Sequence, residues 1–157
     1  MAHSAPRVFL SAACTDPGFA QMVARTLRAE KVECFWDDPR TRADEDDWMS
    51  RLDDVFESAD CYVILLSPEA MASNDIYVEI GFALARARRD MTIEVIPILV
   101  GDVEVKDLPK CLHRSVPIDA SAMTFGELET QLVSRIRRVT YQRGGEDPPF
   151  AAWELGS

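Results

Sequence analysis

The segment Tyr62–Leu66 constrains the fold more than any other part of the chain, because its five consecutive residues are all hydrophobic. A strand with no polar side is typical of the centre of a parallel sheet, where helices cover both faces. Ser67 and Pro68 follow the run and stop it. The segment therefore predicts a buried central strand with helices packed on both of its sides.

Strand-like and helix-like patterns alternate along the chain. Hydrophobic runs at 7–11, 32–36, 62–66, 92–100 and 115–118 predict five strands. Helices are predicted where hydrophobic residues recur every three or four positions: Phe19, Met22, Val23 and Leu27; Trp48, Leu52, Val55, Phe56 and Ala59; Ile76, Ile80, Ala83, Leu84 and Ala87; Phe125, Leu128, Leu132, Ile136 and Val139. Such alternation predicts an α/β fold, a doubly wound five-stranded parallel sheet with helices on both faces.

The ligand crevice of such a sheet lies beyond the carboxyl ends of its strands. The loops expected there are 11–17, 37–47, 67–74 and the segment from Gly101 onward. Functional residues are therefore expected in or beside these four segments.

The chain length fits one domain, which we expect to span residues 1–141. Residues 142–157 contain Gly-Gly, acidic residues and Pro-Pro, and they predict a flexible linker or tail. Two hypotheses stay open at this point: the chain is complete, or it is the effector domain of a larger protein.

The chain is acidic, with 27 Asp and Glu against 17 Lys and Arg and a net charge of −10. Such a surface repels nucleic acid and anionic lipid, so we expect no direct nucleic-acid or membrane partner. The longest hydrophobic runs are too short to span a bilayer and no signal peptide is evident, which predicts a cytoplasmic protein. The cysteines show no metal-ligand spacing and are expected to be reduced thiols; they are Cys14, Cys34, Cys61 and Cys111.

Four short motifs occur in a characteristic order between about Arg7 and Arg138. They are Val8-Phe9-Leu10-Ser11 in the first strand, Trp48 at the second helix, Ser58-Ala59-Asp60 before the strand that ends at Pro68, and Ser73 six residues before Glu79. Together they resemble the TIR (Toll/interleukin-1 receptor) domain family, and its bacterial, NAD-cleaving defence branch in particular. The resemblance implies a flavodoxin-like fold, a loop after the second strand that mediates assembly with other TIR domains, and a catalytic Glu in the third helix, which Glu79 matches.

A single carboxylate suffices for the chemistry that the resemblance implies. The nicotinamide of NAD+ leaves as a neutral molecule, so cleavage of its bond to ribose needs no acid, and a carboxylate can stabilise or trap the cationic ribosyl group. The expected products are nicotinamide and ADP-ribose or a cyclic ADP-ribose, with NAD+ as substrate and no cofactor or metal. Glu79 lies three residues after Ile76 and four before Ala83, so it borders a buried helical stripe and can point into the crevice.

Eight residues are candidates to hold NAD+ beside Glu79. Ser11 and Ser67 end two strands, where their hydroxyls could bind ribose or phosphate oxygens, and Arg40 could face the pyrophosphate or a neighbouring subunit. The others are Phe9, Ala12, Trp48, Ser73 and Tyr77. A structural alternative stays open for several of them: turn formation for the serines, core packing for Phe9 and Trp48, and simple solvation for Arg40.

Two positions depart from the pattern of many catalytic TIR domains: Asp75 replaces an aromatic residue and Glu45 replaces a glycine. Residues 79–83, Glu-Ile-Gly-Phe-Ala, also resemble the nucleophile motif of nucleoside 2-deoxyribosyltransferases. Three hypotheses follow: an NAD+ glycohydrolase activated by oligomerisation in antiphage defence, together with a fused or separate sensor domain; a non-catalytic TIR–TIR assembly module; or a deoxyribosyltransferase. We further expect the acidic loop 37–47 to contact a basic face at Arg86–Arg89 of another copy.

Overall fold

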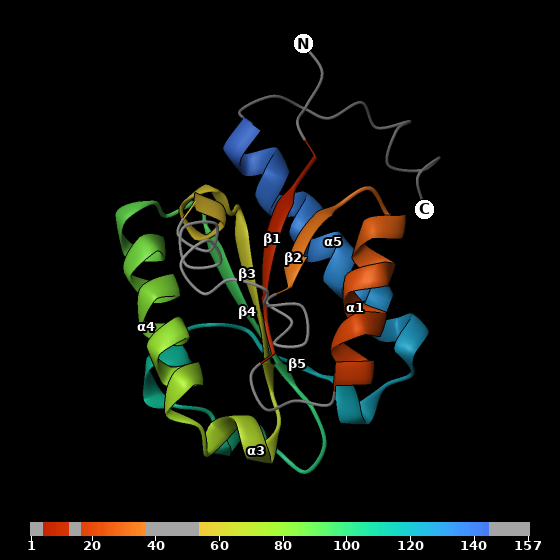
Figure 1. The fold of residues 1–157 in the computed structure, drawn as a ribbon, viewed down its shortest axis with the longest axis vertical. Helices are drawn as coiled ribbons and strands as arrows, with labels where there is room; N and C mark the ends of the chain where they lie inside the picture. Colours follow the sequence, from red (N-terminus) through yellow and green to blue (C-terminus); the bar gives the residue numbers. More distant parts are fainter. Residues whose placement is uncertain (1–4, 13–16, 37–53, 145–157) are drawn as a thin grey trace, which may run out of the picture.

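The computed structural model describes residues 5–12, 17–36 and 54–144 of the chain. Its centre is one sheet of five strands in the order β2-β1-β3-β4-β5, and every neighbouring pair runs parallel (Figure 1). The strands are β1 Arg7–Ser11, β2 Glu33–Trp36, β3 Cys61–Leu66, β4 Glu94–Leu99 and β5 Ile118–Asp119. The predicted fold class, a doubly wound parallel α/β sheet, is confirmed.

Helices cover both faces of the sheet, as the composition of β3 requires (Figure 1). On one face lie α1 (Pro17–Ala29) and α5 (Phe125–Gly144), and on the other lies α4 (Asn74–Arg89), together with the helical residues 54–58. The remaining elements are the short helix α3 (Pro68–Met71) and the 3-10 turns η2 Val105–Asp107, η3 Lys110–Leu112 and η4 Ala120–Ala122.

Alternate side chains of each strand enter two separate cores. Val8 and Leu10 of β1 pack with Leu27 and Leu132 beneath α1 and α5. Phe9, on the opposite face, packs in the core of α4, which also contains Tyr62, Ile64, Leu66, Ile76 and Ile80. All six residues of β3 are buried, so the predicted central strand is confirmed.

The structure refines several predicted boundaries. The segment 67–74, expected to be a loop, contains α3, because the Ser67 side chain caps the helix and Pro68 suits its first turn. The last strand is two residues long and begins at Ile118, where the predicted strand ended. Helix α5 continues to Gly144 and so includes residues 142–144 of the predicted tail; residues 145–157 lie outside the described residues.

No helix within the described parts of the chain is both long and apolar enough to cross a membrane.

Arg86 ties α4 to the segment that precedes β3. Its Nη1 donates hydrogen bonds to the carbonyl oxygens of Phe56 (2.9 Å) and Ala59 (3.1 Å) and to the hydroxyl of Tyr62 (2.9 Å). Its side chain is only 13% exposed and also lies 3.7 Å from a carboxylate oxygen of Glu57. The expected surface cluster Arg86–Arg89 is therefore corrected: Arg86 is a packing residue, and only Arg88 and Arg89 are exposed.

We predict that Arg86→Met lowers the free energy of unfolding by about 2 kcal/mol, because it removes the donor from the Ala59 carbonyl oxygen and the Tyr62 hydroxyl and leaves the Phe56 carbonyl oxygen only the hydroxyl of Tyr62. Urea denaturation followed by circular dichroism measures this loss. Arg88→Met removes the same charge from an exposed position of the same helix and should change stability by less than about 0.5 kcal/mol. Equal losses in the two variants would contradict a packing role specific to Arg86.

Candidate functional site

The carboxyl ends of β1 and β3 form the expected ligand edge of the sheet. In this sheet β2 lies on one side of β1 and the later strands lie on the other, so the strand order reverses between β1 and β3. Ligands of such sheets bind outside the carboxyl ends of the strands at this reversal. Ser11, the last residue of β1, is paired in register with Ile64, so it lies near the end of β3 at Leu66. Ser11 and Ser67 therefore occupy the same edge, beside α3 at the bottom of Figure 1.

Ser11 is a buried polar residue, with only 4% of its surface exposed. Its Oγ makes no hydrogen bond within the part of the chain that the structure describes. Because side chains alternate along a strand, Ser11 lies on the same face as Phe9, the face that α4 covers. It therefore offers a hydroxyl toward the α4 side of the ligand edge.

Ser67 has a structural role at the same edge. Its Oγ accepts a hydrogen bond from the Ala70 backbone N–H at 3.1 Å and so caps the first turn of α3. The Oγ of Ser67 therefore accepts a structural hydrogen bond, whereas the Oγ of Ser11 makes none within the described residues.

Glu79 lies where the sequence predicts it, at the border of the buried stripe of α4. Ile76 and Ile80 are at most 1% exposed, whereas Val78 is 56% exposed on the outer side of the helix. Glu79 between them is half-buried, and its Oε2 atom is buried. Because α4 follows β3 and α3, Glu79 belongs to the half of the helix nearer the ligand edge (Figure 1).

The positions of the remaining candidate residues fit a role in substrate binding less well. Phe9 is 1% exposed, and its ring packs against Phe56 (5.2 Å between centroids), Phe35 (5.6 Å) and Tyr62 (6.1 Å). In this conformation Phe9 is a core residue with no ring face open to a substrate, which corrects the expectation of a stacking role and confirms its core-packing alternative.

Ala12 is half-buried against the core of α1 and α5, and Ser73 is half-buried directly before α4. Tyr77 is 44% exposed, away from the stripe formed by Ile76 and Ile80. Arg40, Trp48 and the side chain of Asp75 lie outside the described residues.

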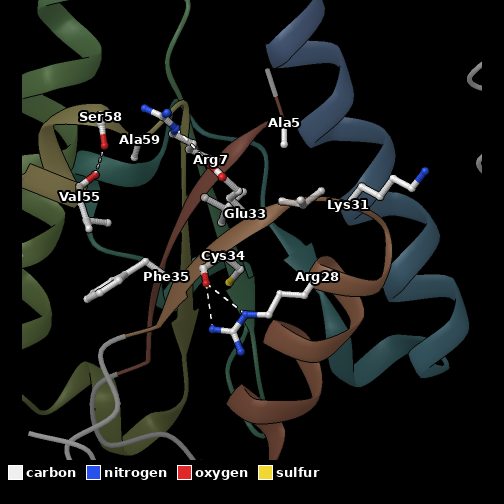
Figure 2. Close-up of a pocket in the computed structure, with 12 residues that line it drawn as sticks. Ala5, Arg7, Arg28, Lys31, Glu33, Cys34, Phe35, Val55, Ser58 and Ala59 are labelled. Carbon is white, nitrogen blue, oxygen red and sulfur yellow. Dashed lines mark hydrogen bonds and ion pairs between the residues drawn. The ribbon is translucent and has the colours of Figure 1, made fainter. Parts of the chain in front are cut away.

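A groove that sequence analysis did not predict runs along the free edge of β2, with a volume of about 780 Å³ (Figure 2). Arg28 donates to the Cys34 carbonyl oxygen from Nη2 (2.9 Å) and Nε (3.3 Å), and Arg7 forms an ion pair with Glu33 at 3.1 Å. Burial raises the pKa of the Cys34 thiol to about 12, so this thiol is protonated and unreactive at neutral pH. The groove contains none of the candidate residues and no activated nucleophile.

Within the described residues no group of three or more His, Cys, Asp or Glu side chains gathers. The residues at or near the ligand edge include the hydroxyl groups of Ser11 and Ser67 and the carboxylate of Glu79.

Comparison with protein families matches the model described as the TIR domain to residues 8–134. The chain belongs to the TIR domain family. This family match includes β1 from Val8 onward, β2 to β5, α4 and the first half of α5, and therefore both Ser11 and Glu79. Comparison with curated protein sequences gives no match.

Solved TIR structures share the fold at low sequence identity. The TIR domain of the Toll-related receptor TRR-2 from Hydra magnipapillata has 17% identity and a TM-score of 0.61, with 87% of this chain and 99% of that chain covered. The RPS4 and RRS1 TIR domain heterodimer gives 15% identity and a TM-score of 0.60, with 87% and 99% covered.

A metazoan TIR-STING receptor from C. gigas gives 17% identity and a TM-score of 0.59 over 89% of this chain. The chain spans only 42% of that receptor. At these identities the likenesses show the fold of the TIR domain alone.

We predict opposite stability effects for the two strand-end serines. Ser11→Ala should leave the free energy of unfolding unchanged or raise it by up to about 1 kcal/mol, because it removes a buried hydroxyl that makes no hydrogen bond within the described residues. Ser67→Ala should lower it by about 1 kcal/mol, because α3 loses its cap. Thermal and urea unfolding of the two variants without ligand test the contrast. A loss in Ser11→Ala as large as that in Ser67→Ala would show that Ser11 holds the fold together.

Proposed function

We propose that this TIR domain is an NAD+ glycohydrolase of the bacterial defence type, in which Glu79 is the catalytic carboxylate. The observation that carries the proposal is the position of Glu79, half-buried on the sheet-facing border of α4 and near the carboxyl ends of β1 and β3. A carboxylate in such a partly dry place acts on a developing positive charge more strongly than it would in water. By resemblance, enzymatic TIR domains carry their Glu at this position, and Glu79 lies within the residues that the TIR family match spans.

The proposed reaction breaks the bond between C1′ of the ribose and the nicotinamide nitrogen. The bonding electrons go to the pyridinium ring, which leaves as neutral nicotinamide, and the Glu79 carboxylate opposes the positive charge on the ribosyl group. Water then adds to C1′ and loses a proton to give ADP-ribose, or a nucleophile of the same molecule adds to give a cyclic product. The chemistry needs only the substrate NAD+, with no further cofactor.

Hydroxyl groups at the ligand edge are suited to hold the substrate. The buried Oγ of Ser11 faces the side of the sheet that α4 covers, and the Ser67 hydroxyl lies at the same edge, where it caps α3. Ribose and pyrophosphate oxygens are acceptors for such donors. Ser73, Ala12, Arg40 and Trp48 remain proposed contacts, whereas Phe9 supports the site from the core and Tyr77 lies exposed, away from the buried stripe.

We propose further that activity depends on assembly, in the cytoplasm, with other TIR domains and with a fused or separate sensor. The solved relatives are named as a receptor in which TIR is combined with STING and as a TIR heterodimer. An unregulated NAD+ glycohydrolase would empty the cell of NAD+, which gives a physical reason to couple activity to assembly.

A non-catalytic assembly module is the second candidate, and the exposed hydrophobic side chains of α4 favour it; they are Tyr77, Val78 and Phe82. A deoxyribosyltransferase that uses Glu79 is the third, and the TIR family match makes it the weakest. Incubation of the protein with NAD+ and with deoxynucleosides, followed by chromatography of the products, separates the three.

We predict that Glu79→Gln lowers the turnover of NAD+ by about 100-fold or more, because it keeps the shape of the side chain but removes its charge. Nicotinamide release measured by liquid chromatography gives the rate, and circular dichroism checks the fold. Glu127→Gln is the matched control, since Glu127 is an exposed carboxylate on α5, on the opposite face of the sheet, and it should keep the parent rate. A Glu79→Gln variant with the parent turnover would remove Glu79 from the mechanism.

A second activity prediction concerns self-association. Specific activity should rise with protein concentration or with added crowding agent, because assembly completes the site. A dilution series of the parent protein at saturating NAD+ measures this dependence. High activity that stays constant over a hundredfold dilution would contradict activation by assembly.

A further inference from the structure

The outer face of α4 is hydrophobic where a surface helix is normally polar. The five exposed residues between positions 77 and 85 are all uncharged, and three of them are large: Tyr77 (44% exposed), Val78 (56%) and Phe82 (62%); the other two are Gly81 and Ala85. Their spacing of three and four places them on one side of the helix over more than two turns. We call these five residues the α4 outer face.

The two helices on the opposite side of the sheet differ from α4 in this respect. Among the exposed residues of α1 are Arg25 and Arg28, and those of α5 include Glu127, Gln131 and Arg138. The inner side of α4 is already covered by the sheet through Ile76 and Ile80. A helix that is apolar on both sides is typical of a buried element, so the α4 outer face has the composition of an interface.

Two details indicate that the partner is another helix. A side chain added at Gly81 would meet no atom within 4 Å, so nothing in the described chain requires glycine at this position, although glycine disfavours helix formation. A second helix crossing at Gly81 would require it, because the lack of a side chain allows close approach. The Phe82 ring also packs edge-on against Phe56, with centroids 6.2 Å apart, so its orientation is fixed before any partner arrives.

The charges at the two ends of α4 select the partner. The last turn carries exposed Arg88 and Arg89, whereas exposed Glu69 of α3 lies near the start of the helix. Two copies of α4 packed antiparallel would set the basic end of each beside the acidic end of the other, and a parallel pair would set like charges together. The surface thus complements itself about a two-fold axis.

We propose that the α4 outer face binds a second copy of this chain as an antiparallel two-fold pair of α4 helices that cross at Gly81. In this pair Tyr77 of one copy lies opposite Ala85 of the other, and Arg88 lies opposite Asn74. Glu79 stays on the inner side of each helix, so the contact leaves the ligand edge accessible. The proposal rests on the self-association in the proposed function and names the surface responsible.

Sedimentation velocity over a concentration series tests the surface. The parent chain should form a dimer of twice the chain mass, and Val78→Lys and Gly81→Leu should each weaken association at least tenfold. Val116→Lys is the control, because Val116 is 69% exposed but precedes β5, away from α4, and it should associate like the parent. Circular dichroism and thermal unfolding of every variant show whether the fold is kept.

Cysteine crosslinking tests the two-fold geometry independently of these variants. In a background with Cys14→Ser and Cys111→Ser, Gly81→Cys should crosslink to itself under mild oxidation, because it lies at the axis. Arg89→Cys alone should not, since antiparallel packing places the two copies of position 89 at opposite ends of the pair.

The outcomes separate this proposal from the proposed function. A parent protein that is monomeric at all concentrations overturns both the α4 pair and activation by self-association. A parent dimer that Val78→Lys and Gly81→Leu leave intact, or that crosslinks through Arg89→Cys and not Gly81→Cys, overturns the α4 pair alone. NAD+ cleavage is judged separately by the Glu79→Gln variant.

Discussion

Burial of both faces of β3 is the constraint on which the rest of the structure depends. Its six residues offer no polar side to water, so one layer of helices has to lie above the sheet and another below it. Parallel pairing with β1 and β4 then requires long connections, and these connections are the covering helices themselves. The chain that leaves β3 must pass over the carboxyl edge before it turns back, which brings α3 and the first half of α4 to the ligand edge.

Glu79 follows from this geometry and from the period of one helix. Its neighbours Ile76, Ile80 and Ala83 are held against the sheet, so the rotation of α4 about its axis is fixed by packing. A carboxylate at the border of that stripe is therefore partly buried and partly exposed to solvent. Arg86 holds the far end of the same helix through three hydrogen bonds, so α4 is held against the fold both along its stripe and at its last turn.

Patterns local to one segment could be predicted from the sequence, whereas properties set by distant neighbours could not. The strand 62–66 and the inward stripe of α4 depend on the spacing within each segment, and the structure confirms both. The burial of Phe9 depends on rings from β2, β3 and residue 56, which lie up to 53 positions away. The sequence does not predict α3, because a Ser-Pro pair such as Ser67-Pro68 can end a strand and can equally begin a helix.

The two faces of α4 connect chemistry with assembly in one rigid element. Contacts on the outer face would hold α4 more rigidly than its inner stripe and Arg86 do alone. A second copy seated on Tyr77, Val78 and Phe82 would therefore restrict the position of Glu79 without touching it. Since a catalytic carboxylate acts only within a narrow range of distances and angles, association at the outer face would favour the competent geometry at the inner border. This coupling between association and the position of Glu79 requires no movement of a loop, because both sides of α4 belong to the same helix.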